Sequence, residues 1–592
     1  MKRKIFFPIL AVATAFSLQS CLDYDVPGDE MNSDQQQLVT NYQGDIDQIN
    51  YRVQASKTGF ETAYEELFPY LGSCKTAQYC LRGGKNGDVP GAHAYQRQYG
   101  LGPDCYAMYM TVPHRDFMYG TLTSTYNNSN DFNGDPRGSY SMVKNGLMPV
   151  LNHPQIDSIP EVKAINLLNY CISAQEMADV SGPFTYIEDK KNSQSPSVYN
   201  TVEDIYKGIV QNLDTIVACL RYHETRPNWY KERVKDILMS FNETNRDLLG
   251  SYTGMSTYIK LANSLKLRMA MHIVKVDPAL AKKWAEEAVS DGVIESIEEQ
   301  SGLFPMVSGF SHPLVTIIDS WGDSRLSASF ESLLMSLDHP YTKYLITKNS
   351  NEITNKKTGE VLPANNKIVG IRSGILVGDG QSYGQNQRIA YSGIDRNYLN
   401  DAPLYLVKFA EVDFLRAEGA LRGWNMGGTP EFFYERGIRN AYLDEPWYVY
   451  EYKDLVDAYM QREEPIAYVQ KDPMGDGSDW ESVTKIGVKW NDADSKETKL
   501  EKIITQKYIA LFPLSTEAWT ELRRTGYPKC FPVLNTNDGD GSIPQGELIR
   551  RIPWQSTDPI ELQNINNTGL SALGGPDLQA TRLWWDVDAP NF

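Results

Sequence analysis

Hydrophobic residues recur at helical spacing in long stretches of the sequence. In residues 160–181, Ile165, Leu168 and Ile172 fall on one side of a predicted helix that begins with a proline. Residues 201–222 carry a second apolar stripe, and this segment opens with a capping box that suits a helix N-terminus. The two predicted helices follow each other in the sequence, so we expect them to be neighbours.

Three further segments have the pattern of paired helices. Residues 253–294 hold two helical segments with a turn at Pro278, and small alanines in both segments permit a close approach. Residues 404–424 with 430–443, and residues 500–527, show a comparable pattern. These pairs resemble tetratricopeptide hairpins, but their spacing is irregular. The sequence therefore predicts a mainly helical single domain and not a regular solenoid.

Long segments rich in Gly, Asn, Asp and Tyr separate the predicted helix pairs. They span residues 73–140, 301–340 and 347–403. Structureless segments of this size are uncommon in compact domains unless they carry function. We therefore expect loop-rich insertions that form a ligand-binding face, with a short β-hairpin where residues 367–378 alternate.

The N-terminus has the layout of a secretion signal. Lys2, Arg3 and Lys4 precede an uncharged segment, residues 5–18, which is shorter than the roughly 20 residues needed to span a bilayer. The segment is followed by Gln-Ser-Cys21, which resembles a bacterial lipobox, where the cysteine is lipidated and becomes the new N-terminus. An ordinary secretory signal with an incidental cysteine is the alternative.

This pattern divides the chain into three predicted parts. Residues 1–20 are a lipoprotein signal peptide, and residues 21–44 form a flexible lipidated tether of polar composition. Residues 45–592 form a single binding domain.

The charge balance excludes one class of partner. The chain has 57 Lys plus Arg against 75 Asp plus Glu, and loss of residues 1–20 removes three bases and no acid, which changes the formal charge from −18 to −21. Phosphate backbones would repel such a chain, and no basic stripe interleaved with aromatic residues is present, so we expect no nucleic-acid partner.

Cysteines give little guidance about structure. Cys171 and Cys219 fall on apolar faces of predicted helices, so we expect buried free thiols there. The pairing of the others stays open; they are Cys74, Cys80, Cys105 and Cys530.

Two catalytic or metal-binding patterns are present in weak form. Gly322-Asp323-Ser324 is similar to a string found in one class of lipases, but no histidine is marked as its partner, so a membrane-anchored hydrolase is a minor alternative. Asp538, Asp540 and Glu547 occupy three positions of an EF-hand calcium template whose first position is Thr536. We expect no cofactor, with calcium as a weak candidate.

Three strings together resemble the SusD/RagB family of outer-membrane lipoproteins. They are LVKFAEVDFLRAEGALRG at 406–423, the segment 503–528, and GGPDLQATRLWWD at 574–586. The resemblance implies a helical body with four tetratricopeptide-like hairpins, anchored in the outer membrane and exposed at the cell surface. It also implies a non-enzymatic protein that binds oligosaccharides, or in some branches peptides, and delivers them to a SusC-like TonB-dependent transporter.

Sugar capture needs flat aromatic faces for the C–H side of sugar rings and planar polar groups for their hydroxyls. The chain holds 36 tyrosines and 11 tryptophans, and many of the tyrosines lie in the Gly- and Asn-rich segments. The candidate ligand-binding residues are Tyr95, Arg97 and Tyr99 in the early loop and Trp321, Asp323 and Arg325 in a later one. Core packing of Trp321 is the competing interpretation.

We predict that the mature chain begins at Cys21 and carries acyl chains. Mass spectrometry of the protein extracted from membranes should find the N-terminal peptide with lipid on this cysteine. An unacylated, freely secreted mature chain would contradict the prediction.

Overall fold

The computed structural model describes most of the folded part of the chain. The described residues are 45–49, 56–83, 85–86, 89–114, 123–127, 135–190, 197–243, 253–377, 387–443, 449–554 and 556–592. The predicted signal peptide, the tether and Cys21 lie outside these residues.

The described chain is mainly helical, which confirms the predicted fold class. The longer helices are α3 (Lys57–Cys80), α6 (Arg137–Leu151), α7 (Pro160–Ser181), α9 (Val202–His223), α10 (Asn228–Phe241), α11 (Met255–His272), α12 (Pro278–Asp291), α15 (Ala328–Leu337), α18 (Phe409–Leu421), α19 (Pro430–Leu443), α20 (Val449–Met460), α21 (Lys496–Leu511) and α22 (Ser515–Thr525). Short helices are α4 (Ala92–Tyr95), α5 (Pro103–Tyr106), α8 (Tyr186–Lys190), α13 (Pro305–Ser308), α14 (Pro313–Val315), α16 (Tyr341–Tyr344), α17 (Arg396–Asp401), α23 (Pro559–Asn564) and α24 (Leu570–Leu573).

Strands are short and pair in twos, all antiparallel. The pairs are β1 (Lys85–Asn86) with β2 (Val89–Pro90), β3 (Met110–Thr111) with β5 (Arg325–Leu326), β4 (Ser301–Leu303) with β8 (Leu404–Val407), β6 (Ile353–Thr354) with β7 (Val361–Leu362), and β9 (Val469–Gln470) with β10 (Trp480–Glu481). The pairs β3–β5 and β4–β8 join segments far apart in sequence and so tie the loop regions to the helical body.

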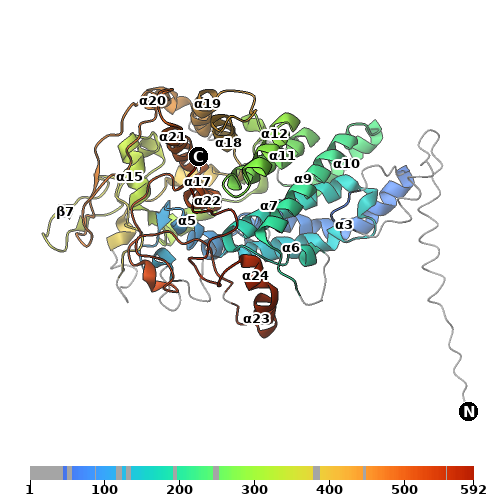
Figure 1. Ribbon diagram of the computed structural model, residues 1–592, viewed down its shortest axis with the longest axis horizontal. Helices are drawn as coiled ribbons and strands as arrows, with labels where there is room; N and C mark the ends of the chain where they lie inside the picture. Colours follow the sequence, from blue (N-terminus) through green and yellow to red (C-terminus); the bar gives the residue numbers. More distant parts are fainter. Residues whose placement is uncertain are drawn as a thin grey trace, which may run out of the picture.

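Helix pairs form the body of the molecule, as Figure 1 shows. Helix α3 packs on α6, α7 on α9, α11 on α12, and α18 on α19, while α21 and α22 pack on each other and on this set. Helix α15 and the β6–β7 hairpin lie at the end of the molecule away from α10 (Figure 1). The loop-rich insertions therefore gather at one end of a helical scaffold.

Capping residues mark several of the predicted helix ends. Thr201 accepts a hydrogen bond from the amide of Asp204 at the start of α9, and Asp277 accepts one from the amide of Leu280 at the start of α12. Gly526 ends α22 in the left-handed conformation, with φ of 76°. The predicted starts of α9 and α12 are confirmed because their capping signals are local in sequence.

Helix α7 was predicted to have one buried apolar face, but the structure buries the whole helix. Every residue from Pro160 to Ser181 is buried, because neighbouring helices cover α7 on all sides. Its polar residues are accommodated by partners: Glu161 accepts hydrogen bonds from His223 and Tyr230, at 2.8 and 2.7 Å. Cys171 and Cys219 are buried free thiols, as expected.

Two expectations for the long segments were wrong in detail. Residues 73–140 include the end of α3 and the start of α6, and residues 301–340 include α15. The β-hairpin lies at 353–362 and not at 367–378, where Ile371 instead forms a parallel bridge with Ser327. Alternation in 367–378 therefore reflects contact with the start of α15 and not pairing within the segment.

No described helix combines the length and the apolar character required to cross a membrane.

The contact between α3 and α6 depends on a glycine. A Cβ at Gly146 would lie 2.9 Å from both the Ala77 Cβ and the Ser73 carbonyl oxygen, whereas a Cβ at Gly72 meets nothing within 4 Å. We predict that Gly146→Ala lowers the free energy of unfolding by about 1–3 kcal/mol through overpacking. The same substitution at Gly72, an exposed helical position, should raise it by about 0.5–1 kcal/mol.

Denaturant unfolding of the two variants beside the parent chain measures both effects. Equal responses of the two glycines would contradict the proposed close contact, because helix propensity alone treats them alike.

Candidate functional site

The structure brings the two groups of predicted ligand-binding residues together. Asp323 follows a π-helical turn at Thr316–Ser320, and its carboxylate accepts hydrogen bonds from the Gln96 side chain at 2.6 Å and from the His114 ring at 2.9 Å. Gln96 begins a second π-helical turn, Gln96–Gly100, which also contains Arg97 and Tyr99. The early and the later loop therefore meet at the Asp323 carboxylate.

Tyr95 and Tyr99 are buried, which corrects their expected place on a binding surface. Their exposed fractions are 3% and 2%, and the two rings lie against each other with centroids 5.4 Å apart. The Tyr99 hydroxyl donates a hydrogen bond to Glu176 of α7. Neither ring offers a free face to a sugar, because each fills space between the loop and the helical body.

Arg325 is also a structural residue. It is 7% exposed, and its guanidinium donates to the backbone carbonyls of Ile318, Ser324 and Ile389 at 2.7–2.8 Å. These bonds fix the loop that carries Asp323. Arg97, in contrast, is exposed to solvent.

Trp321 is partly buried and partly accessible. It packs against the hydrophobic core at the end of the π-helical turn, so part of the ring supports the fold and the rest reaches solvent. Trp321 precedes the fixed carboxylate of Asp323 by two residues, and a partly exposed indole and a carboxylate are candidates for an apolar face and a hydrogen-bond acceptor. Among the predicted residues, Arg97 is exposed, and Trp321 and Asp323 are partly exposed.

Gln96 and His114 were not predicted and complete this site. His114 is 4% exposed and Gln96 is also 4% exposed, so both are held in place while they orient Asp323. No periodicity marks either residue in the sequence, since both lie in irregular segments whose neighbours are set by tertiary contact.

The hydrolase interpretation gains no support from the geometry of Ser324. Its hydroxyl is buried and has no hydrogen-bond partner in the described part of the chain. A serine nucleophile requires a base within hydrogen-bond reach. His114, the histidine at this site, instead bonds to Asp323.

The three residues of the calcium candidate are not one of the close groups of ligand atoms found among the described residues. Asp538 accepts a hydrogen bond from the Thr125 hydroxyl at 2.7 Å. Asp540 accepts hydrogen bonds from Ser542 and from the backbone amide of Gln579. Glu547 is exposed and lies 3.9 Å from Arg550. Internal donors thus bond to two of the three carboxylates, and calcium binding at these residues stays a prediction.

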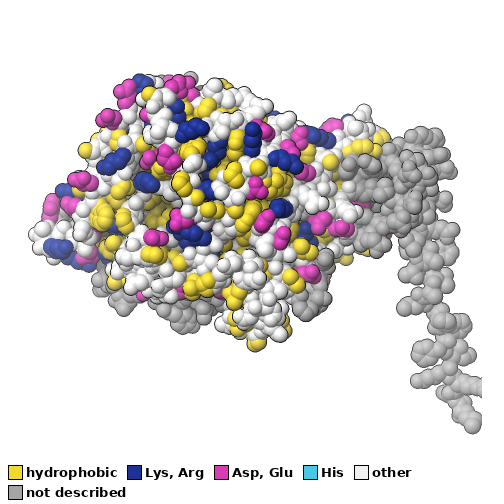
Figure 2. All heavy atoms as spheres, in the orientation of Figure 1, with side chains coloured by type: hydrophobic (Ala, Val, Ile, Leu, Met, Phe, Trp, Pro, Cys, Tyr) yellow, Lys and Arg dark blue, Asp and Glu magenta, His cyan; other side chains and the backbone are white. Residues whose placement is uncertain are grey.

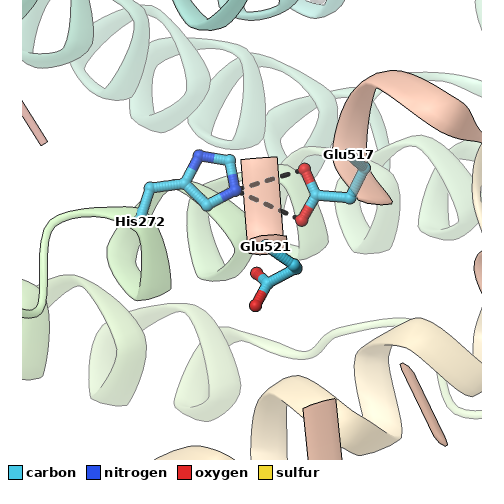
Figure 3. A group of neighbouring side chains, drawn as sticks. All are labelled: His272, Glu517 and Glu521. Carbon is cyan, nitrogen blue, oxygen red and sulfur yellow. Dashed lines mark hydrogen bonds and ion pairs between the residues drawn. The ribbon is translucent and has the colours of Figure 1, made fainter. Parts of the chain in front are cut away.

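A different group of metal-ligand type lies in the core: His272 of α11 with Glu517 and Glu521 of α22 (Figure 3). Within the described residues, it is the one set whose ligand atoms approach closely enough to share an ion. The Lys507 ammonium of α21 already bonds to both glutamates, at 2.9 Å each. Because a cation occupies the place between the carboxylates, this group is an ionic cluster and not a metal centre.

The cluster extends through five helices of the scaffold, since Asp179 of α7 lies 3.4 Å from the His272 ring. Arg268 of α11 forms a bidentate pair with Glu411 of α18, at 2.6 and 2.8 Å. Arg524 of α22 bonds to both Glu521 and Glu418, each at 2.6 Å. All these side chains are at most 2% exposed.

Charge neighbours set the protonation of His272. Burial disfavours the imidazolium, but Glu517 and Asp179 outweigh burial and raise the pKa of His272 to about 9. Burial likewise disfavours charge on Glu517, yet Lys507, His272 and Arg268 hold its pKa well below the usual value. His272 is therefore a cation in the folded protein at neutral pH.

The described residues form a scaffold of helix pairs with irregular loops at one end, and a partly exposed indole and fixed polar groups lie on these loops. The chain belongs to the family of SusD-like proteins, the SusD and RagB outer-membrane lipoproteins, which matches residues 76–586. This confirms the family resemblance of the sequence. No curated protein sequence matches the chain.

Solved structures of the same family share the fold over most of the chain. A chitin-binding SusD homologue from Flavobacterium johnsoniae is 31% identical, with a TM-score of 0.72 over 89% of this chain and 99% of that one. A SusD homologue from Bacteroides thetaiotaomicron is 26% identical, with a TM-score of 0.72 over 88% and 99%. One from Bacteroides vulgatus is 27% identical, with a TM-score of 0.71 over 90% and 100%.

The raised pKa of His272 predicts a pH-dependent stability. A group protonated more strongly in the folded state stabilises it fully below its unfolded pKa of 6.5 and loses that effect as pH rises through about 9. The shift corresponds to about 3 kcal/mol. We expect the difference in unfolding free energy between the parent chain and His272→Gln to shrink by this amount from pH 6 to about pH 9.5.

Urea unfolding at several pH values measures the difference, and the exposed His93→Gln is the matched control. Parallel pH profiles for the parent chain and His272→Gln would show that His272 is not charged in the fold.

Proposed function

We propose that this protein is a lipid-anchored receptor of the outer membrane that binds oligosaccharides at the cell surface and delivers them to a SusC-like TonB-dependent transporter. The observation that carries the proposal is the family match over residues 76–586, joined to a chitin-binding homologue at 31% identity. Cys21 would hold the acyl chains, and residues 21–44 would link them to the binding domain.

The site at Trp321 has the physical features that capture of a neutral glycan requires. The indole covers the C–H face of a sugar ring and removes it from water, while Asp323 accepts hydrogen bonds from hydroxyl groups. Gln96 and His114 hold the carboxylate in one orientation, so little entropy is lost when a ligand binds. Each carboxylate oxygen accepts one of these bonds and retains capacity for a second.

A shallow surface of this kind favours modest affinity and rapid release. Such behaviour suits a receptor that passes cargo to a transporter, because very tight binding would slow the transfer. Coupling of several weak contacts along one oligosaccharide chain would raise avidity where needed.

Binding by a receptor needs no chemical change in the ligand. The non-enzymatic role is supported by the family match. A peptide receptor on the same scaffold remains the alternative, because the scaffold alone does not select between cargo classes.

We predict that Trp321→Ala weakens oligosaccharide binding by about tenfold or more, because it removes the apolar face of the site. The matched control is Trp229→Ala on α10, where another partly buried indole contacts Phe60 at a centroid distance of 6.0 Å. Isothermal titration with chitin oligosaccharides, other neutral glycans and a peptide panel measures the effect.

Both variants lose a partly packed indole, so similar thermal unfolding of the two separates binding from stability. Binding of peptides but of no glycan would replace the oligosaccharide assignment. Equal affinity of Trp321→Ala and the parent chain for a bound glycan would remove Trp321 from the site.

A further inference from the structure

A second hollow lies near the loop end of the molecule, between helices α15 and α16 and the segments 366–368 and 468–471. Its volume is about 350 Å³. This lies within the range of small-molecule sites, roughly 300–1,000 Å³. The lining contains none of the residues placed around Trp321, so this is a separate pocket.

Aromatic, apolar and amide groups line part of this pocket. Tyr468 contributes a partly buried ring, Ile368 and Val469 contribute apolar surface, and Asn366 contributes an exposed amide. A ring face with nearby apolar and amide groups suits a compact ligand that has both C–H and hydroxyl surfaces.

The Tyr468 ring is fixed by a buried carboxyl group. Its hydroxyl donates a hydrogen bond to Glu331, which also accepts from the Gly370 amide at 2.7 Å and from the Gln470 side chain at 3.3 Å. Glu331 is 1% exposed, and burial raises its pKa to about 7. At neutral pH this carboxyl therefore contributes only part of a negative charge to the pocket.

Four lysines surround the pocket, although the chain as a whole has a formal charge of −18. Lys343 and Lys471 each lie near one exposed aspartate, at 3.5 and 3.7 Å. Exposed pairs of this kind contribute little energy and leave the ammonium groups available. The ammonium groups of Lys348 and Lys367 form no hydrogen bond or ion pair with the residues that the structure describes.

Basic, acidic and hydrophobic side chains are interspersed on the face of the molecule over α15, at the left of Figure 2. The lysines thus surround a partly apolar hollow and are not part of a uniformly charged surface. A positive rim on an acidic protein attracts anions locally, and the low-polarity walls strengthen that attraction.

We propose that this pocket binds an anionic saccharide unit, one that carries a carboxylate or a sulfate, in contact with Tyr468 and the ammonium groups of Lys348 and Lys367. The saccharide class rests on the proposed function, and the charge preference rests on the lysines. An acidic peptide is the less favoured ligand, because its extended backbone would need unpaired strand or backbone groups at the pocket. The Tyr468 ring and the four lysines of the lining supply the flat face and the positive charge that an anionic sugar would contact.

Three matched disaccharides test the proposal on the full-length protein. They are chitobiose as the neutral reference, glucuronyl-N-acetylglucosamine for the carboxylate, and 6-sulfated chitobiose for the sulfate. Ligand-observed NMR or isothermal titration at low salt should show about tenfold tighter binding of at least one anionic disaccharide than of chitobiose. Raising the salt to about 0.3 M should reduce that preference by screening.

Lys348→Ala with Lys367→Ala should abolish the preference for the anionic disaccharide. The control is Lys282→Ala with Lys283→Ala on α12, which removes the same charge from exposed lysines whose nearest carboxylates are 3.8 and 3.9 Å away. The control should bind like the parent chain, which separates a pocket contact from a change in overall charge.

Trp321→Ala distinguishes this inference from the proposed function. Loss of chitin-oligosaccharide binding with retained lysine-dependent binding of the anionic disaccharide supports two separate sites. Lysine-dependent anionic binding without any binding of neutral glycan supports the pocket and contradicts capture at Trp321. Three results would each overturn the inference. The parent chain could bind neutral and anionic disaccharides with equal affinity, or the Lys348/Lys367 variant could keep the preference for the anionic disaccharide. The third result is lysine-dependent binding of tri-aspartate without binding of any anionic disaccharide.

Discussion

The scaffold depends on an ionic cluster that is sealed from water. Removal of charges from water costs several kcal/mol for each ion, so such a cluster persists only if every charge has partners of opposite sign. Glu517 meets His272 and Lys507, and Glu521 meets Lys507 and Arg524. Since these partners come from α11, α21 and α22, a shift of any one helix would leave a charge unpaired, and the helices are held in one register.

That fixed register explains how irregular segments hold their positions without long strands. The Tyr508 hydroxyl of α21 donates to the Ala107 carbonyl, and the Tyr109 hydroxyl donates to the Tyr508 carbonyl. These reciprocal bonds fasten the early loop to a helix that the ionic cluster already fixes. The loop in turn presents Gln96 and His114 to Asp323. The charged core therefore fixes the loop, and the loop fixes the residues of the surface site.

Sequence reasoning succeeded where the signal was local and failed where it depended on tertiary contact. The Thr201 cap and the Pro278 turn predicted α9 and the α11–α12 pair, because capping involves residues close in sequence. Tyr95 and Tyr99 were expected at the surface, but irregular segments have no periodicity that tells a buried ring from an exposed one. The lysine pocket was not predicted because Lys348, Lys367 and Lys471 converge only in the folded chain.

The two proposed binding regions differ in the force that would attract a ligand. The surface at Trp321 relies on removal of apolar area from water, which salt changes little, whereas the pocket at Lys348 and Lys367 relies on charge, which salt screens. A mixed glycan with neutral and anionic units would use both if its length spans the two regions, and its affinity would then exceed that of either unit through effective concentration. Selection among glycans would follow from the order of charged units along the chain, because one fixed scaffold sets the separation of the two regions.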